Sequence, residues 1–316
     1  MKKILLLLTV STFCSILLPA QKVKDLLSSA RTFAEQKKYD EAVSVLKKAK
    51  AIDSANYNVI IGLSEMYYEL QQWQDCYDEL SAGILLYPDS PFLYFSRAEM
   101  LYTTVNTDAA IADYTTTLKM VDADSLILGC LLNRGACYSQ KREFQLAYED
   151  YTKASLIAGD NTAILNNMAT ALDELGRADD AILILKKIIT LDSTFLGSYV
   201  NLGFQYTKLG RYKEAIEYFD KAIELDKKEP LTYNNRGLAR YHLGDHNGAL
   251  ADINESLRIY PQNSYAYKNR ALVYLALKEK EKACADIQKA LELGFTKMYG
   301  EEVLQLKKAN CDKTTN

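Results

Sequence analysis

The chain repeats its own sequence pattern every 34 residues. Eight successive units can be aligned, and they begin at Val23, Tyr57, Pro91, Leu128, Thr162, Leu196, Pro230 and Ser264. A single insertion of three residues, 125–127, precedes the fourth unit. A repeat of this length is typical of a stack of supersecondary units in which each unit packs only on its neighbours. The estimate of about two globular domains that the length alone suggests therefore does not apply.

Two columns of small residues run through the units. The eighth position holds Ala30, Ser64, Ala98, Gly135, Ala169, Gly203, Gly237 and Ala271. The twentieth position holds Ala42, Cys76, Ala110, Ala147, Ala181, Ala215, Ala249 and Ala283. Small side chains at these two positions allow two antiparallel helices to approach closely. The fourth and eleventh positions are mostly large and apolar, which completes an apolar stripe at helical spacing.

The fifteenth position of each unit is where the first helix is expected to end. Glycine occupies it in three units, as Gly176, Gly210 and Gly244. Glycine adopts the left-handed conformation that commonly closes a helix. Each unit is therefore predicted to be a helix, a turn and a second helix.

These columns resemble the tetratricopeptide repeat, most completely over residues 199–226, which read YVNLGFQYTKLGRYKEAIEYFDKAIELD. The resemblance extends over eight repeats in residues 23–297. It implies an all-α fold, a right-handed α-solenoid of helix-turn-helix repeats whose first helices line a concave surface. Residues 298–311 are expected to form a capping helix over the last repeat. Residues 312–316 are expected to be a disordered tail.

The first twenty residues are typical of a secretory signal peptide. Lys2 and Lys3 precede an apolar stretch, and Pro19 and Ala20 precede the expected cleavage point. This predicts a secreted or periplasmic protein that is cut after Ala20. The alternative, a lipoprotein attached through Cys14, is disfavoured because a large residue precedes this cysteine, which lies midway in the apolar stretch.

An arginine at the seventh position occurs only together with an aspartate at the twenty-third. The four pairs are Arg97 with Asp113, Arg134 with Asp150, Arg236 with Asp252 and Arg270 with Asp286. The matched spacing of sixteen residues predicts an ion pair between the two helices of one repeat. The alternative is a ladder of arginines that binds an acidic ligand. The first interpretation is favoured because a ligand-binding arginine needs no matched acid in its own repeat.

Two sets of residues are predicted to lie on the concave face. Asparagine fills the sixth position in repeats 4–8, as Asn133, Asn167, Asn201, Asn235 and Asn269. The amides offer both a donor and an acceptor, so they would bind the backbone of an extended peptide or bond to neighbouring helices. Nearer the N-terminus the face is aromatic, with Tyr68, Phe92, Phe95 and Tyr102. These rings would anchor a partner or pack between repeats.

The sequence gives little support for catalysis, a cofactor or a metal. His242 and His246 are the two histidines, and the expected turn lies between them. Phosphate-binding loops and nucleophile motifs are absent from the sequence. Cys284 and Cys311 differ from the other cysteines, because antiparallel packing of the cap would bring them together. A disulfide there suits an oxidising compartment.

Composition favours a protein partner over nucleic acid. The net charge is −3, whereas nucleic-acid-binding domains usually carry a strongly basic face. The predicted function is a scaffold or adaptor that binds extended or helical segments of proteins in the cell envelope, with membrane contact only through such a complex. The alternative is a non-catalytic regulatory subunit of an envelope enzyme that contacts a folded partner.

Overall fold

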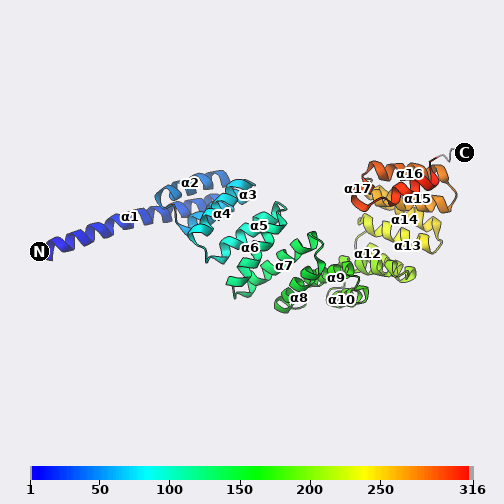
Figure 1. Cartoon of the computed structure of the whole chain (residues 1–316), viewed down its shortest axis with the longest axis horizontal. Helices are drawn as coiled ribbons and strands as arrows, with labels where there is room; N and C mark the ends of the chain where they lie inside the picture. Colours follow the sequence, from blue (N-terminus) through cyan, green and yellow to red (C-terminus); the bar gives the residue numbers. More distant parts are fainter. Residues whose placement is uncertain (1, 313–316) are drawn as a thin grey trace. The chain divides into compact units, whose positions relative to one another are not determined.

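The computed structural model describes residues 2–312, and the side chains of residues 19–312. Every regular element in this part of the chain is a helix (Figure 1). The chain divides into two compact units, residues 1–159 and 160–316, and the division falls between the fourth and fifth repeats. From here on, unit 1 denotes residues 1–159 and unit 2 denotes residues 160–316, and each contains four of the 34-residue repeats.

Consecutive helices pack in pairs within each unit. Unit 1 contains α1 (Lys2–Glu35), α2 (Tyr39–Ile52), α3 (Tyr57–Glu69), α4 (Trp73–Leu86), α5 (Pro91–Thr103), α6 (Thr107–Met120), α7 (Asp124–Gln140) and α8 (Phe144–Ala158). Unit 2 contains α9 (Thr162–Glu174), α10 (Ala178–Leu191), α11 (Leu196–Lys208), α12 (Tyr212–Leu225), α13 (Pro230–His242), α14 (His246–Ile259), α15 (Ser264–Ala276), α16 (Lys280–Glu292), α17 (Phe295–Tyr299) and α18 (Glu302–Asn310). Odd-numbered helices from α1 to α15 are the first helices of the repeats.

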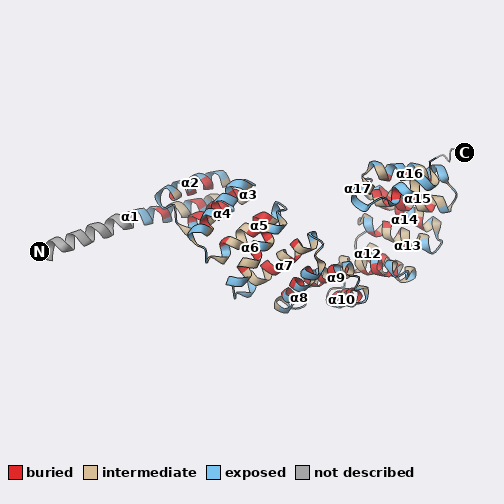
Figure 2. Cartoon of the chain, in the orientation of Figure 1, coloured by how far each residue is buried: buried red, intermediate tan, exposed pale blue. Residues whose placement is uncertain are grey.

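The small residues lie where the paired helices touch. All eight residues of the twentieth column are buried, and buried residues form a stripe along the helices (Figure 2). A Cβ atom added to Gly203 would lie 2.5 Å from the Phe219 ring, and one added to Gly135 would lie 2.7 Å from the Tyr151 ring. Such distances are far below van der Waals contact. In these two repeats, glycine at the eighth position thus makes room for a large aromatic ring of the second helix.

The turn inside every repeat contains one residue with a positive φ, always at the fifteenth position. In unit 2 it is Gly176, Gly210, Gly244 or Lys278, with φ between 63° and 81°. In unit 1 it is Lys37, Gln71, Val105 or Arg142, with φ between 56° and 61°. The left-handed ending is therefore a property of the repeat and not of glycine. A β-branched residue such as Val105 is strained there.

Two details depart from the expected repeat. The insertion at 125–127 lies inside the first turn of α7, so it lengthens that helix rather than forming a loop. The expected single capping helix is divided into α17 and α18, because Gly300 takes a φ of 88° between them. Val303 of α18 is fully buried against the last repeat.

The side chains of residues 1–18 and the whole of residues 313–316 lie outside the described part. The expected signal peptide, Cys14 and most of the expected tail fall there. In the part that the structure describes, no helix has the length and apolar character needed to cross a membrane.

Candidate functional site

Each of the four arginines binds its matched aspartate through two parallel hydrogen bonds. Nε and Nη2 donate to the two carboxylate oxygens at 2.6–2.9 Å in all four pairs. The arginine side chains are 13–20% exposed and the aspartates 3–9%. This two-point geometry is the strong form of the arginine–carboxylate pair. The guanidinium groups are thus engaged within the fold and are not directed at a ligand.

The same arginines also reach the preceding repeat, which the sequence analysis did not foresee. Nη1 of each donates to the twenty-fifth position of the repeat before it, namely Ser81, Thr115, Asp220 and Asn254, at 2.6–3.1 Å. Each arginine therefore joins three helices: its own, its partner helix and the last helix of the neighbouring repeat. The sequence does not reveal these acceptors, because the four positions hold four different residue types.

A second kind of junction occurs where the arginine is missing. In repeats 1 and 5 the twenty-fifth position is a lysine, and the next repeat has no arginine at its seventh position. Each lysine lies over the tyrosine at the eleventh position of that next repeat. The distance from Nζ to the ring centre is 5.8 Å for Lys47 over Tyr67 and for Lys186 over Tyr206. A cation over an aromatic face is attractive at this range.

Two of the four asparagines of this row in unit 2 bond to the preceding repeat. Asn201 donates to Asn166 at 3.0 Å, and Asn269 donates to Asn234 at 3.0 Å. Asn269 is fully buried, so its amide is not offered to a partner in this structure. Asn235 is half-buried and Asn167 is exposed. In unit 1, Asn133 of α7 donates to Glu99 of α5 at 2.6 Å.

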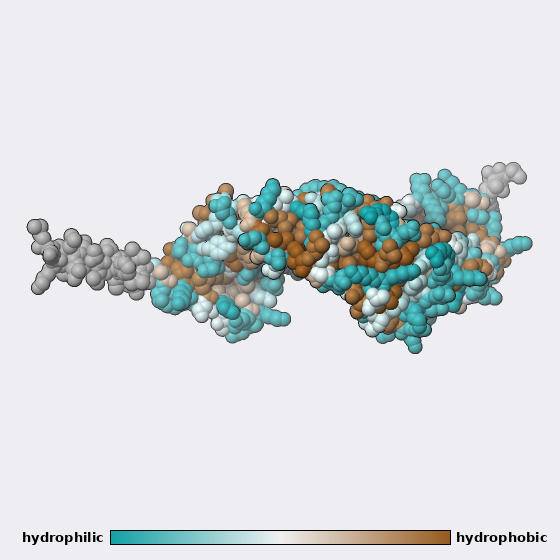
Figure 3. Space-filling model, turned by 90° about the horizontal axis from the view of Figure 1, so that it is seen from below, coloured by the Kyte–Doolittle hydropathy of each residue, from teal (hydrophilic) through white to brown (hydrophobic). Residues whose placement is uncertain are grey.

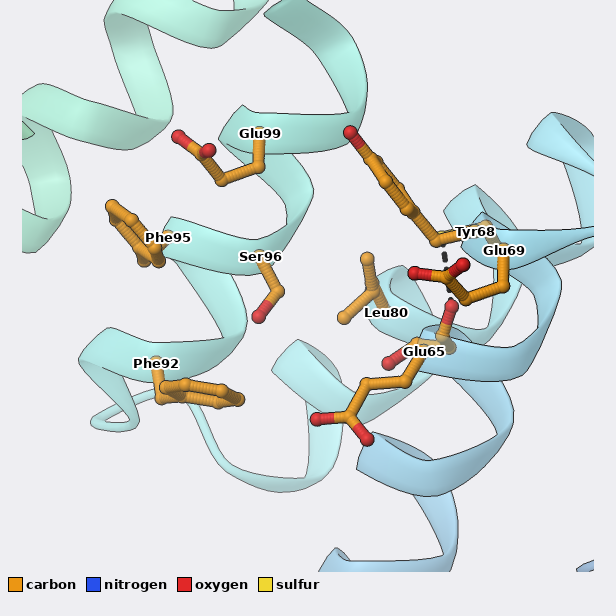
Figure 4. Close-up of a pocket in the computed structure, with 10 residues that line it drawn as sticks. Glu65, Tyr68, Glu69, Leu80, Phe92, Phe95, Ser96 and Glu99 are labelled. Carbon is orange, nitrogen blue, oxygen red and sulfur yellow. Dashed lines mark hydrogen bonds between the residues drawn. The ribbon is translucent and has the colours of Figure 1, made fainter. Parts of the chain in front are cut away.

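The aromatic face of unit 1 contains a hollow between α3 and α5 (Figure 4). Its volume is about 280 Å³, and its surface is mostly apolar. Tyr68 lies on one wall, Phe92 and Phe95 on the other, and the side chain of Leu80 from α4 lies between the walls (Figure 4). The two walls are first helices of adjacent repeats, and they approach less closely than α1 and α3 or α5 and α7 do. Tyr102 does not line this hollow.

Packing holds the walls of the hollow in place. The Tyr68 ring meets Trp73 edge to face at 5.4 Å, and its hydroxyl bonds with Thr103 of α5 at 2.8 Å. Phe95 packs against Tyr114 with ring centres 6.1 Å apart. Phe92 is different, because 40% of its surface is exposed without a ring partner among the described residues. The hollow is thus preformed, with one ring available to a partner.

The cysteines of unit 2 form a disulfide, whereas those of unit 1 are free thiols. Cys284 and Cys311 are joined by a disulfide with a Cα–Cα distance of 5.6 Å, which ties α16 to the end of α18. Cys76, Cys130 and Cys137 of unit 1 are buried thiols. Loss of hydration raises their pKa, to about 11 for Cys76 and Cys137 and about 12 for Cys130. These thiols therefore stay protonated and unreactive at neutral pH.

Both histidines lie against tyrosine rings, but only His242 is stacked on one. His242 lies parallel to the Tyr212 ring at 4.6 Å, and loss of hydration lowers the pKa of His242. Among the described residues, no group of three potential ligands is close enough together to hold a metal ion.

Sequence profiles of the tetratricopeptide repeat match residues 33–95, 162–195, 198–229, 230–263 and 264–293. Together these segments make up more than half of the chain. The chain belongs to the tetratricopeptide repeat family. In this family the repeats serve protein–protein interaction, which places the chain among interaction scaffolds.

Solved structures share the fold at low sequence identity. A tetratricopeptide repeat protein from Parabacteroides merdae has a TM-score of 0.56 at 20% identity, over 91% of this chain and 99% of that one. A chain of the APC/C hetero-tetramer Cut9–Hcn1 has a TM-score of 0.59 at 18% identity, over 89% of this chain and 55% of that one. A curated relative, the BBSome complex member BBS4 homolog of Drosophila melanogaster, is 21% identical over 150 residues. That match spans 47% of this chain and only 30% of the relative.

Proposed function

We propose that this tetratricopeptide repeat protein is a non-catalytic adaptor that binds extended or helical segments of partner proteins through the hollow between α3 and α5. The observation that supports this most is a preformed apolar hollow on the first helices with an exposed ring, Phe92, at its edge. Exposed aromatic rings beside a pocket are frequent anchors in protein interfaces. The asparagine row of unit 2 contributes less to this proposal, because Asn201 and Asn269 are bonded within the fold.

A screen of the purified protein against an array of short peptides tests the proposal. Phe92→Ser should abolish capture of the retained peptides, since the ring forms the open edge of the hollow. Phe204→Ser is the matched control, because Phe204 on α11 of unit 2 has a similar exposed fraction, 43% against 40%. Equal losses in both variants, or a loss only with Phe204→Ser, would contradict the proposed site.

The regulatory-subunit alternative has support of its own on the second helices. Leu85 of α4 and Leu156 of α8 are 85% and 82% exposed, and apolar areas appear among hydrophilic ones on the surface (Figure 3). Exposed apolar side chains of this kind can contact a folded partner. Under this alternative, serine at both positions would remove partner capture while Phe92→Ser would not.

The envelope location is part of the proposal. It is supported by the signal-like first twenty residues and by the disulfide, which persists in oxidising compartments. Fractionation of the native host, with N-terminal sequencing of the recovered protein, tests it. A mature chain beginning at Gln21 outside the cytoplasm is expected, and an uncut cytoplasmic chain would refute it.

A further inference from the structure

The hollow between α3 and α5 has an apolar interior but an acidic rim. Glu65 and Glu69 extend from α3, and Glu99 extends from α5 (Figure 4). The ten described residues that line the hollow include no lysine or arginine. A site with this lining is complementary in charge to a cationic group.

No cation among the described residues pairs with the carboxylates of the rim. Glu99 accepts hydrogen bonds from the Tyr114 hydroxyl and from Asn133. Glu69 interacts with the Tyr39 hydroxyl and raises the pKa of that phenol, after the larger effect of lost hydration. Glu65 has no hydrogen bond or ion pair with another described residue, and loss of hydration raises its pKa. Hydrogen bonds thus position Glu99 and Glu69, and no cationic side chain of the described residues neutralises the rim.

Glu65 and Glu69 are four residues apart on one helix, where like charges repel each other. A cation placed between them would relieve this repulsion. The rim does not meet the needs of a metal ion, since no three ligands converge anywhere in the described residues. An organic cation with an apolar stem fits the combination of rings and carboxylates better, because lysine and arginine bury their stems while the charged end stays near water.

A second hollow of about 260 Å³ lies between α1 and α3. Leu27, Ile61 and Met66 are among the residues that line it, and Glu65 borders both hollows. Arg31 also borders this second hollow, where its guanidinium pairs with Glu35 at 3.2 Å. An extended segment that crosses α3 would therefore meet an apolar hollow, then the Glu65 carboxylate, and then the other apolar hollow.

Resting on the proposed function, we infer that the segment recognised by unit 1 carries a lysine or arginine flanked by apolar side chains. The basic group lies at Glu65 and Glu69, and the apolar neighbours enter the hollows on either side of α3. The carboxylates select the charge, and the rings with Leu80 bind the stem.

Fluorescence anisotropy with short end-blocked peptides tests this inference in the full chain. The probe contains one lysine between two leucines, and matched probes carry arginine, norleucine or glutamate instead of the lysine. The lysine and arginine probes should bind about tenfold more tightly than the norleucine probe at low salt, and the difference should shrink as salt is added. The glutamate probe should bind least.

Two variants locate the selectivity. Glu65→Gln should remove most of the preference for lysine over norleucine, and Glu69→Gln should reduce it. Glu149→Gln is the control, since Glu149 is a glutamate of α8 outside the hollow whose bond from Gln145 the amide oxygen can still accept. Thermal unfolding verifies that each variant is folded. If Glu65→Gln or Glu69→Gln does not fold, the other of these two variants provides the test.

The outcomes separate the inference from the proposed function. If lysine and norleucine probes bind equally and Phe92→Ser abolishes both, peptides bind at the hollow but the charge preference is refuted. If no probe binds and Phe92→Ser changes nothing in the array screen, the hollow is not a peptide site and both proposals fall.

Discussion

Units 1 and 2 are built from the same repeat but use their first helices differently. In both units, polar side chains of successive first helices bond to each other, as Asn201 does to Asn166 in unit 2 and Tyr68 does to Thr103 in unit 1. In unit 1, however, α3 and α5 also leave between them a hollow lined by aromatic rings and carboxylates. The same packing between paired helices thus leaves the inner positions free to differ, and in unit 1 they form the hollow that we propose as the binding site.

The arginine junctions offer the largest expected effect in this comparison. Arg134→Met in unit 1 leaves the Asp150 carboxylate, 3% exposed, without its cation, and should lower the free energy of unfolding by about 3–5 kcal/mol. Arg236→Met in unit 2 should cost less, because Arg240 also binds Asp252 at 2.9 Å. Urea unfolding of both variants measures the difference. Equal losses would show that Arg240 gives no compensation.

Glycine substitutions test how tightly the paired helices pack. In unit 2, Gly203→Ala would place a methyl group 2.5 Å from the Phe219 ring and should destabilise the protein by about 1–3 kcal/mol. In unit 1, Gly62→Ala brings its methyl group to 3.1 Å from the end of the Leu46 side chain, which can move. Alanine is also the better helix former, so this change should be close to neutral. Thermal unfolding compares them, and a neutral Gly203→Ala would disprove the close approach.

The turns give the smallest effect and one with the opposite sign. Val105→Gly in unit 1 should stabilise the protein by about 1 kcal/mol, because a positive φ of 60° strains valine and not glycine. Val105 is 73% exposed, so little packing is lost. The reverse change in unit 2, Gly210→Val, should destabilise by a similar amount. The midpoint of urea unfolding measures both, and a loss of stability in Val105→Gly would contradict the strain.

The repeat pattern predicted those features that recur at fixed positions in the sequence. Helix pairing follows from the two columns of small residues, and the ion pairs followed because arginine and aspartate change together. The predicted left-handed turn also occurs in the five repeats without glycine, such as that of Val105, where sequence gives no sign of it. Fixed spacing along the chain, not residue identity alone, is what made these elements predictable.

Features that depend on distances between repeats could not be predicted in the same way. The third bond of each arginine goes to serine, threonine, aspartate or asparagine, so no column of one residue type reveals it. A weaker signal was present, since lysine at that position never precedes an arginine repeat. The hollow depends on how far α3 and α5 separate, and side-chain packing beneath them decides that distance.

The bond that each arginine makes to the repeat before it gives the repeats an order. A repeat with arginine at its seventh position requires a neighbour that presents an acceptor, and a neighbour that presents Lys47 or Lys186 would set two cations against each other. Repeats of this chain are therefore not interchangeable modules. Transplanting repeat 3 behind repeat 1, for example, would place Lys47 of repeat 1 beside Arg97 of repeat 3.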